Sequence, residues 1–129
     1  MLPFIVHFKS GMPVYEQVLL AVKRAVTAGR LVPGDKFPSV RILSQELRIN
    51  PNTAHKVISA LVEAGLLRVQ PGIGTIVGQT RAVTAEQRQQ LLEQEVERLV
   101  VEARMISLGL EELLTAVRRA WSQLAREQK

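Results

Sequence analysis

The chain contains no cysteine, and aromatic residues make up only 4% of its 129 residues. The absence of cysteine excludes a disulfide framework and a cysteine-based zinc site, and it agrees with a reducing compartment. Only two histidines remain as metal ligands of the nitrogen type, so we predict no metal and no cofactor. No stretch approaches the roughly 18 consecutive apolar residues of a membrane span. The N-terminal residues lack the charged and apolar regions of a signal peptide, so we expect a cytoplasmic protein.

Acidic residues are scarce in the first 78 positions. Nine lysines and arginines lie there against four acids, whereas residues 79–129 carry eight of each. The whole net charge of +5 therefore belongs to the first part, which favours a polyanionic partner. A membrane surface would also attract this charge, but no segment joins a strongly basic face to a large, aromatic-rich apolar one. We therefore predict no membrane partner.

The sequence offers no catalytic constellation. The two histidines, His7 and His55, are widely separated, and the acids fall singly or on the surfaces of predicted helices. A nucleophile with its base, a pair of carboxylates or a metal centre would require such groups to converge. We predict that the chain is not an enzyme.

Residues 38–56, PSVRILSQELRINPNTAHK, predict two short helices joined by a tight turn. In the first helix, apolar residues recur at the three- and four-residue spacing of one buried stripe. Ser39 lies where its N-cap should be. Asn50 followed by Pro51 is typical of the N-cap and first residue of a second helix, which leaves positions 48 and 49 as the turn.

The second helix is apolar on one face and polar on the other. Nothing outward in its N-terminal half is apolar or acidic, and its amide, hydroxyl, imidazole and ammonium groups suit base edges and phosphates. A plain solvent-exposed amphipathic helix is the alternative interpretation, which only the neighbouring elements can decide. The apolar face carries Ala54, Val57, Ile58 and Leu61, and the polar face carries Asn52, His55, Lys56, Ser59 and Glu63.

Elements before this motif add a helix and two connections. Residues 4–8 alternate in polarity and predict a short strand or an arm packed on another element, with His7 in a structural role. A helix is predicted to begin near Pro13 and to stop at Gly29. The Pro33-Gly34 turn follows, and residues beside it are expected to pair briefly with a later strand.

Residues 66–70 and 75–77 after the motif predict a hairpin with a glycine-rich tip at residues 71–74. Glycine there permits positive backbone dihedrals and a close approach to another surface. Directly after two helices of this kind, the hairpin predicts the wing of a winged helix. A phosphate-binding loop is the competing use of glycines, but the Gly-Lys-Ser/Thr signature and a following helix are missing.

From Thr84 onward the pattern is long, charged and helical, with a coiled-coil-like apolar seam. Gly109 interrupts the seam, so we predict two helices with a sharp connection. Two such helices cover only part of their apolar surface, and a partner subunit is predicted to cover the rest, with Trp121 as an anchor. The alternative is that this surface covers the first domain. The residues assigned to dimerisation are Leu92, Val96, Leu99, Ala103, Ile106, Leu110, Leu113, Val117 and Trp121.

Four runs resemble the GntR family of bacterial transcriptional regulators: PVYEQ at 13–17, GRLVPGDKFPSVR at 29–41, NPNT at 50–53 and GIGTIV at 72–77. The short helical tail is similar to the YtrA subfamily, whose members lack a large effector domain and dimerise through such a segment. The resemblance implies a winged helix, a homodimer, a palindromic operator and usually repression. The resemblance does not identify a small-molecule effector. The chain departs from many members at Ile73, where they carry a basic wing residue.

We therefore predict a mainly α fold, with an N-terminal winged helix-turn-helix and β-hairpin wing in residues 1–78 and two dimerising helices in 79–129. The predicted function is that of a homodimeric transcriptional repressor, which binds a palindromic operator in double-stranded DNA sequence-specifically. The alternative is a winged-helix protein–protein interaction module. The resemblance assigns DNA contacts by position to Arg41, Asn52, Thr53, His55 and Gly74. The full set assigned to DNA is Lys36, Ser39, Arg41, Asn50, Asn52, Thr53, His55, Lys56, Arg68, Gly72 and Gly74.

Overall fold

The computed structural model describes residues 2–79 and 83–127. These residues form two compact units, one within 2–79 and the other within 83–126, and each is described by itself. The predicted boundary after residue 78 is followed closely by residues 80–82, which lie outside the described part. The elements are mainly helical with one two-stranded antiparallel hairpin, which confirms the predicted fold class.

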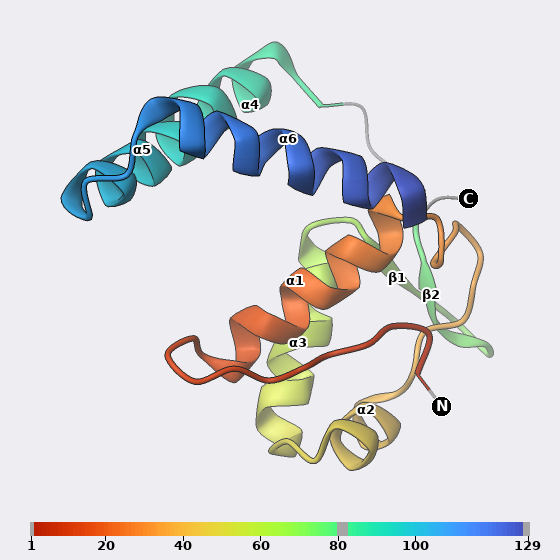
Figure 1. The fold of residues 1–129 in the computed structure, drawn as a ribbon. Coiled ribbons are helices and arrows are strands. Elements are labelled where there is room, and N and C mark those ends of the chain that lie inside the picture. Colours follow the sequence, from red (N-terminus) through yellow and green to blue (C-terminus); the bar gives the residue numbers. More distant parts are fainter. Residues whose placement is uncertain (1, 80–82, 128–129) are drawn as a thin grey trace. The chain divides into compact units, whose positions relative to one another are not determined.

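The first unit contains three helices and the hairpin (Figure 1). They are α1 (Val14–Thr27), α2 (Val40–Leu47), α3 (Pro51–Glu63), β1 (Leu67–Gln70) and β2 (Gly74–Val77). Each helix turns one apolar stripe toward a common centre, which is the packing expected of amphipathic helices. The buried core consists of Phe4, Val18, Ala21, Val22, Ala25, Leu31, Phe37, Leu43, Ala54, Val57, Ile58, Leu61, Leu67 and Val77.

The two helices of the predicted motif begin and end as the sequence predicts. The Ser39 hydroxyl oxygen accepts a hydrogen bond of 3.2 Å from the backbone N–H of Ile42, which caps α2. The Asn50 side-chain oxygen accepts one of 2.8 Å from the backbone N–H of Asn52, which caps α3. Between them Arg48 has φ 55° and ψ 48°, the left-handed conformation that ends α2 and redirects the chain.

The hairpin pairs with a segment that precedes α2. Within the hairpin, Leu67 lies opposite Val77 and Gln70 opposite Gly74. The N–H of Phe37 donates to the Thr75 carbonyl at 2.9 Å, and the N–H of Val77 donates to the Asp35 carbonyl at 2.8 Å. This confirms the predicted pairing beside the Pro33-Gly34 turn, and it ties the wing to the start of α2.

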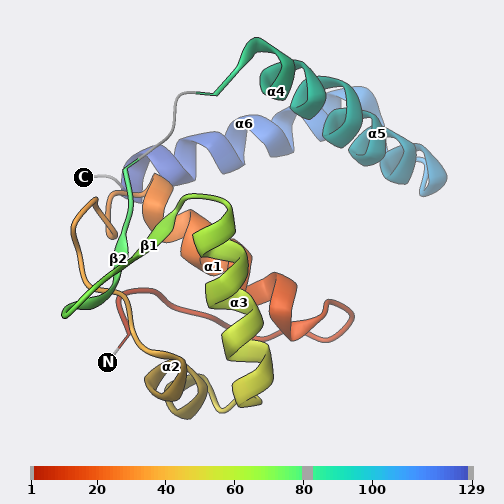
Figure 2. The same cartoon turned by 180° about the vertical axis from the view of Figure 1, so that it is seen from behind.

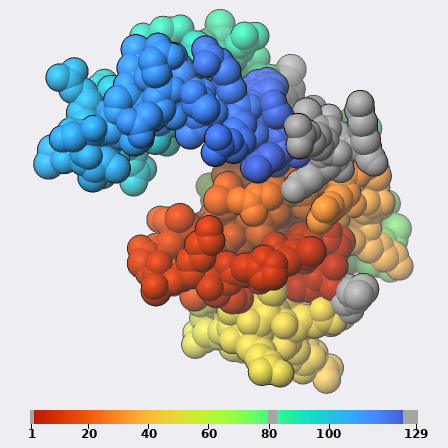
Figure 3. All heavy atoms as spheres, viewed as in Figure 1, coloured from red at the N-terminus to blue at the C-terminus, as the bar shows by residue number. Residues whose placement is uncertain are grey.

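Residues 4–8 form an arm and not a strand, which decides between the two sequence-based alternatives. The Phe4 ring is 5% exposed and stacks on the Phe37 ring with centroids 5.9 Å apart. At its other end, the arm is held by Gln17 of α1, whose side-chain oxygen accepts from the N–H of Lys9 at 2.8 Å and whose amide donates to the Lys9 carbonyl at 2.9 Å. Figure 3 shows the arm, in red, lying at the surface over the orange helix α1.

The second unit contains α4 (Ala85–Gln90), a π-helical segment η1 (Leu91–Glu95), α5 (Val96–Met105) and α6 (Leu110–Glu127). Thr84 and Gln87 form a capping box at the start of α4. The seam was predicted to follow regular α-helical spacing, but η1 interrupts it with one wide turn. Among the described residues, the helices are too short or too polar to cross a membrane.

The connection between α5 and α6 differs from the prediction. Gly109 was expected to follow the end of the first helix, but α5 ends at Met105 and the left-handed residue is Ser107, with φ 59°. Gly109 instead precedes α6, and its carbonyl accepts from the N–H of Leu113 at 3.0 Å. Ile106, assigned to the seam, is therefore the C-cap residue of α5 and is 74% exposed.

Candidate nucleic-acid interface

The rotation of α3 about its axis is fixed by its buried face. Ala54, Val57 and Leu61 are each fully buried. Asn52, His55, Lys56, Ser59 and Glu63 are all exposed, as the sequence predicts, while Thr53 is half-buried. The polar face of α3 is therefore presented outward as one continuous surface.

The N-terminal end of α3 is suited to bind an anion. Its first turn contains no acidic residue, so the partial positive charge of the helix N-terminus is not compensated there. The Asn50 side-chain oxygen is occupied by the cap, which leaves its amide N–H groups as donors. The Ser39 oxygen has the same capping role at α2. Arg41 lies exposed in the first turn of α2, which packs on α3.

Two basic residues lie on either side of strand β2. Ile76 pairs with Arg68 across the hairpin and forms an isolated antiparallel bridge with Lys36. Side chains of directly paired residues lie on the same face of a sheet, so Lys36 and Arg68 flank Ile76, which is 5% exposed. Both basic side chains are exposed, so one positive charge lies on the wing and the other on the segment that pairs with it.

The tip of the wing depends on backbone conformation. Gly72 has φ 79° and Gly74 has φ 112°, a region that L side chains rarely adopt. A Cβ atom at either position would meet no atom within 4 Å, so dihedral strain and not space explains these glycines. Ile73 between them is 52% exposed. Figure 2 shows the tip extending away from the helices.

The assigned DNA-binding residues fall into two groups. One group surrounds α2 and the N-terminal end of α3, and the other lies on the hairpin (Figures 1 and 2). Sequence reasoning assigned no functional role to Tyr15. Tyr15 is half-buried and lines an open hollow of about 540 Å³ against the polar face of α3, together with Thr53, His55, Lys56, Ser59, Ala60 and Glu63.

Comparison with known proteins identifies the family. Residues 14–77 match the model of the bacterial regulatory proteins of the gntR family. The HTH-type transcriptional repressor YtrA of Bacillus subtilis is 31% identical over 106 residues, which cover 81% of this chain and 82% of that protein. The chain belongs to the GntR family. This GntR chain is a DNA-binding transcriptional regulator and not an enzyme.

Solved structures extend the likeness beyond the matched residues. YtrA from Sulfolobus acidocaldarius, a GntR-family transcription factor, is 25% identical, with a TM-score of 0.53 over 92% of this chain and 97% of that one. A transcriptional antiterminator from Listeria monocytogenes EGD-e shares the fold, with a TM-score of 0.80 and 23% identity over 94% of this chain and 91% of that one. The likeness therefore includes the helical tail of the GntR chain as well as its winged helix.

Proposed function

We propose that this GntR regulator binds a palindromic operator in double-stranded DNA as a homodimer and represses transcription there, within the cytoplasm. The N-terminal end of α3 enters the major groove, and the wing at Gly72–Gly74 lies beside the adjacent minor groove. The observation that carries this proposal is the outward face of α3, whose N-terminal half is polar and free of acids. Repression is proposed because the relative from Bacillus subtilis is named a repressor.

The assigned residues divide between positioning and reading. Lys36, Arg41, Lys56 and Arg68 carry full charges on exposed side chains, and such groups suit phosphates whatever the sequence. Asn52, Thr53 and His55 lie, with Lys56, in the first two turns of α3, where recognition helices contact base edges. We assign these three to reading and the four charged residues to the backbone.

The homodimer is proposed from the second unit. Eight of the nine residues assigned to dimerisation remain at least partly accessible, whereas Ala103 is 6% exposed and is covered within the chain. Leu92, Leu110 and Trp121 are 60%, 67% and 78% exposed. Large apolar surfaces of this kind mark association sites, and residues 79–129 carry eight charges of each sign, so two copies do not repel each other. A homodimer places two α3 helices on one palindrome.

Salt dependence tests the electrostatic part of the proposal. If the four basic residues contact phosphates in both subunits, the dimer neutralises on the order of six to eight phosphates, and log K falls with log salt at a slope of about −5 to −7. The DNA for this measurement is the promoter fragment of the protein's own gene, and footprinting on that fragment locates the bound site. A slope near zero would show that DNA contacts do not depend on these charges.

A further inference from the structure

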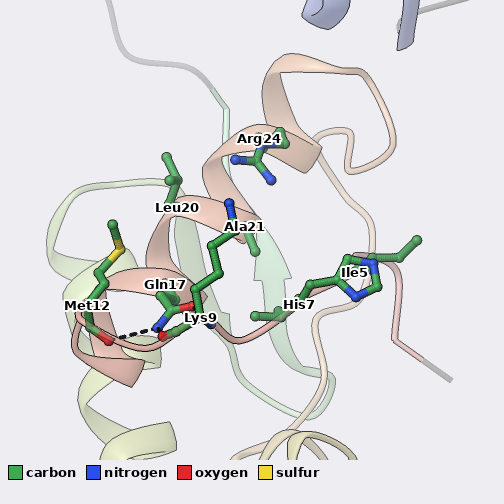
Figure 4. A pocket seen from close by; sticks show the side chains of 9 residues that line it. Ile5, His7, Lys9, Met12, Gln17, Leu20, Ala21 and Arg24 are labelled. Atoms are coloured by element: carbon green, nitrogen blue, oxygen red, sulfur yellow. Dashed lines mark hydrogen bonds between the residues drawn. The ribbon is translucent and has the colours of Figure 1, made fainter. Parts of the chain in front are cut away.

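Two adjoining hollows lie between the N-terminal arm and α1. Each has a volume of about 210 Å³, and they share Ile5, His7, Ala21 and Arg24 in their walls. We call them together the arm cleft. Figure 4 shows the first hollow, with the arm along one side and α1 along the other. Its remaining lining residues include Lys9, Met12, Gln17 and Leu20, and the second hollow adds Phe4, Ala25 and Arg30.

The walls of the arm cleft are held in place by the contacts of the arm. Phe4 is fixed by its stack on Phe37, and Lys9 is fixed by two reciprocal hydrogen bonds to Gln17. The Gln17 amide also donates to the Met12 carbonyl at 2.7 Å. Residues between these two anchors must span the surface of α1, which keeps a hollow open beneath them. A largely preformed cavity of this kind lowers the cost of ordering on binding.

The chemistry of the arm cleft is basic and apolar at once. His7, Lys9, Arg24 and Arg30 supply the ionisable groups of its lining, which includes no carboxylate. Figure 4 shows the Lys9 side chain extending along α1 toward Arg24. Large apolar side chains also face water beside these cations, since Ile5 is 61% exposed and Leu20 48% exposed.

We propose that the arm cleft binds a small organic anion, in which a carboxylate or phosphate is joined to a short apolar body. The anionic group pairs with Arg24 and Lys9 through charge-assisted hydrogen bonds. The apolar body covers Ile5 and Leu20, which removes their surface from water. Each hollow, at about 210 Å³, lies below the range of roughly 300–1,000 Å³ that is typical of drug-sized pockets, which matches a small ligand.

The position of Arg24 favours a small anion over the DNA backbone. Arg24 lies in the last turn of α1. In both ribbon views the C-terminal ends of α1 and α3 lie on the same side of the first unit, away from α2 and from the N-terminal end of α3 (Figures 1 and 2). A duplex that contacts the start of α3 therefore does not reach Arg24, and its charge is available to another ligand.

Titration of the full chain with hexanoate and with phenyl phosphate tests the site and distinguishes a carboxylate from a phosphate headgroup. The readout is the set of backbone amide NMR shifts of residues 5–9 and 20–24, so the test does not depend on DNA binding. We expect saturable shifts with at least one of the two anions. Arg24→Gln should weaken that binding at least about tenfold. Lys23→Gln is the matched control, because it removes a neighbouring exposed charge outside the cleft, and it should change Kd less than about twofold.

Four results would overturn the proposal. The first is the absence of saturable shifts with both anions up to about 10 mM. The second is an equal loss of binding for Arg24→Gln and Lys23→Gln, which would indicate general charge attraction. The third is equal binding of neutral 1-hexanol. The fourth is a DNA salt slope that Arg24→Gln flattens by about two units per dimer, because this would assign Arg24 to phosphates of the duplex.

Discussion

Asn52→Ala and Lys56→Ala remove two exposed side chains that lie one turn apart on the same face of α3. The capping bond at Asn52 uses its backbone N–H and the Asn50 side chain, so alanine at position 52 leaves the cap intact. Alanine also favours the helix. The free energy of unfolding of both variants should therefore lie within about 0.5 kcal/mol of the wild-type value. Any change in DNA affinity is then due to the lost side-chain contact and not to unfolding.

The expected losses differ in kind. An asparagine amide that pairs bidentately with adenine contributes about 1–3 kcal/mol of discrimination, which corresponds to about fivefold to 150-fold per half-site. Asn52→Ala should show this loss mainly on the preferred operator. Lys56→Ala should weaken binding to all sequences alike and flatten the salt slope by about one unit per subunit, because one phosphate contact is lost in each.

The assay compares binding of the wild type and both variants on operator and scrambled DNA over a salt series. Ser59→Ala serves as the control, since Ser59 is exposed on the same helix about two turns beyond Asn52 and should change affinity little. Equal losses on both DNAs for Asn52→Ala would refute its assignment to base reading. Specificity would then rest on Thr53, His55 or the wing.

Three further predictions concern assembly and packing. A fragment that ends at residue 78 should sediment as a monomer and bind the palindrome much more weakly, and a dimeric fragment would contradict the interface in the second unit. Phe4→Ala should lower the free energy of unfolding, measured by urea denaturation, by about 3–5 kcal/mol. Phe8→Ala, which removes a side chain that is 43% exposed, should lower it by less than about 1 kcal/mol. Gly78→Ala should lower the free energy of unfolding by about 1–3 kcal/mol, because its Cβ would lie 2.8 Å from a backbone carbonyl oxygen. Gly109→Ala is the control: no atom lies closer than 3.6 Å to its Cβ, so the midpoint of thermal unfolding should stay nearly unchanged.

Local signals predicted helices α2 and α3 and their caps. The caps at Ser39 and Asn50 can be predicted because a hydroxyl or amide at that position satisfies a backbone N–H within the next few residues. The exposed face of α3 can be predicted from the helical spacing of apolar residues within a segment of only thirteen residues. Both features depend on neighbours in sequence, and both are confirmed.

Other features depend on contacts that are distant in sequence or on small energy differences. The stack of Phe4 on Phe37 joins residues 33 positions apart, and no periodicity indicates it. Ser107 takes the left-handed conformation that was expected to require a glycine, so the preference for glycine at a helix end predicts the wrong residue. The hollow beside Tyr15 arises from the packing of α1 on α3. The roles of the assigned DNA-contacting residues stay predictions.

The π-helical segment Leu91–Glu95 has a consequence for how this helix compares with those of other regulators. An α-helix turns by about 100° per residue, and a π segment accommodates roughly one residue more than an α-helix of the same rise. Deleting one residue there should restore a continuous α-helix and leave the faces of α4 and α5 in nearly the same relative orientation, because the wide turn already absorbs the extra residue. Relatives with an uninterrupted helix should therefore align with this chain through a one-residue gap at positions 91–95, with the residues on either side of that gap on the same faces.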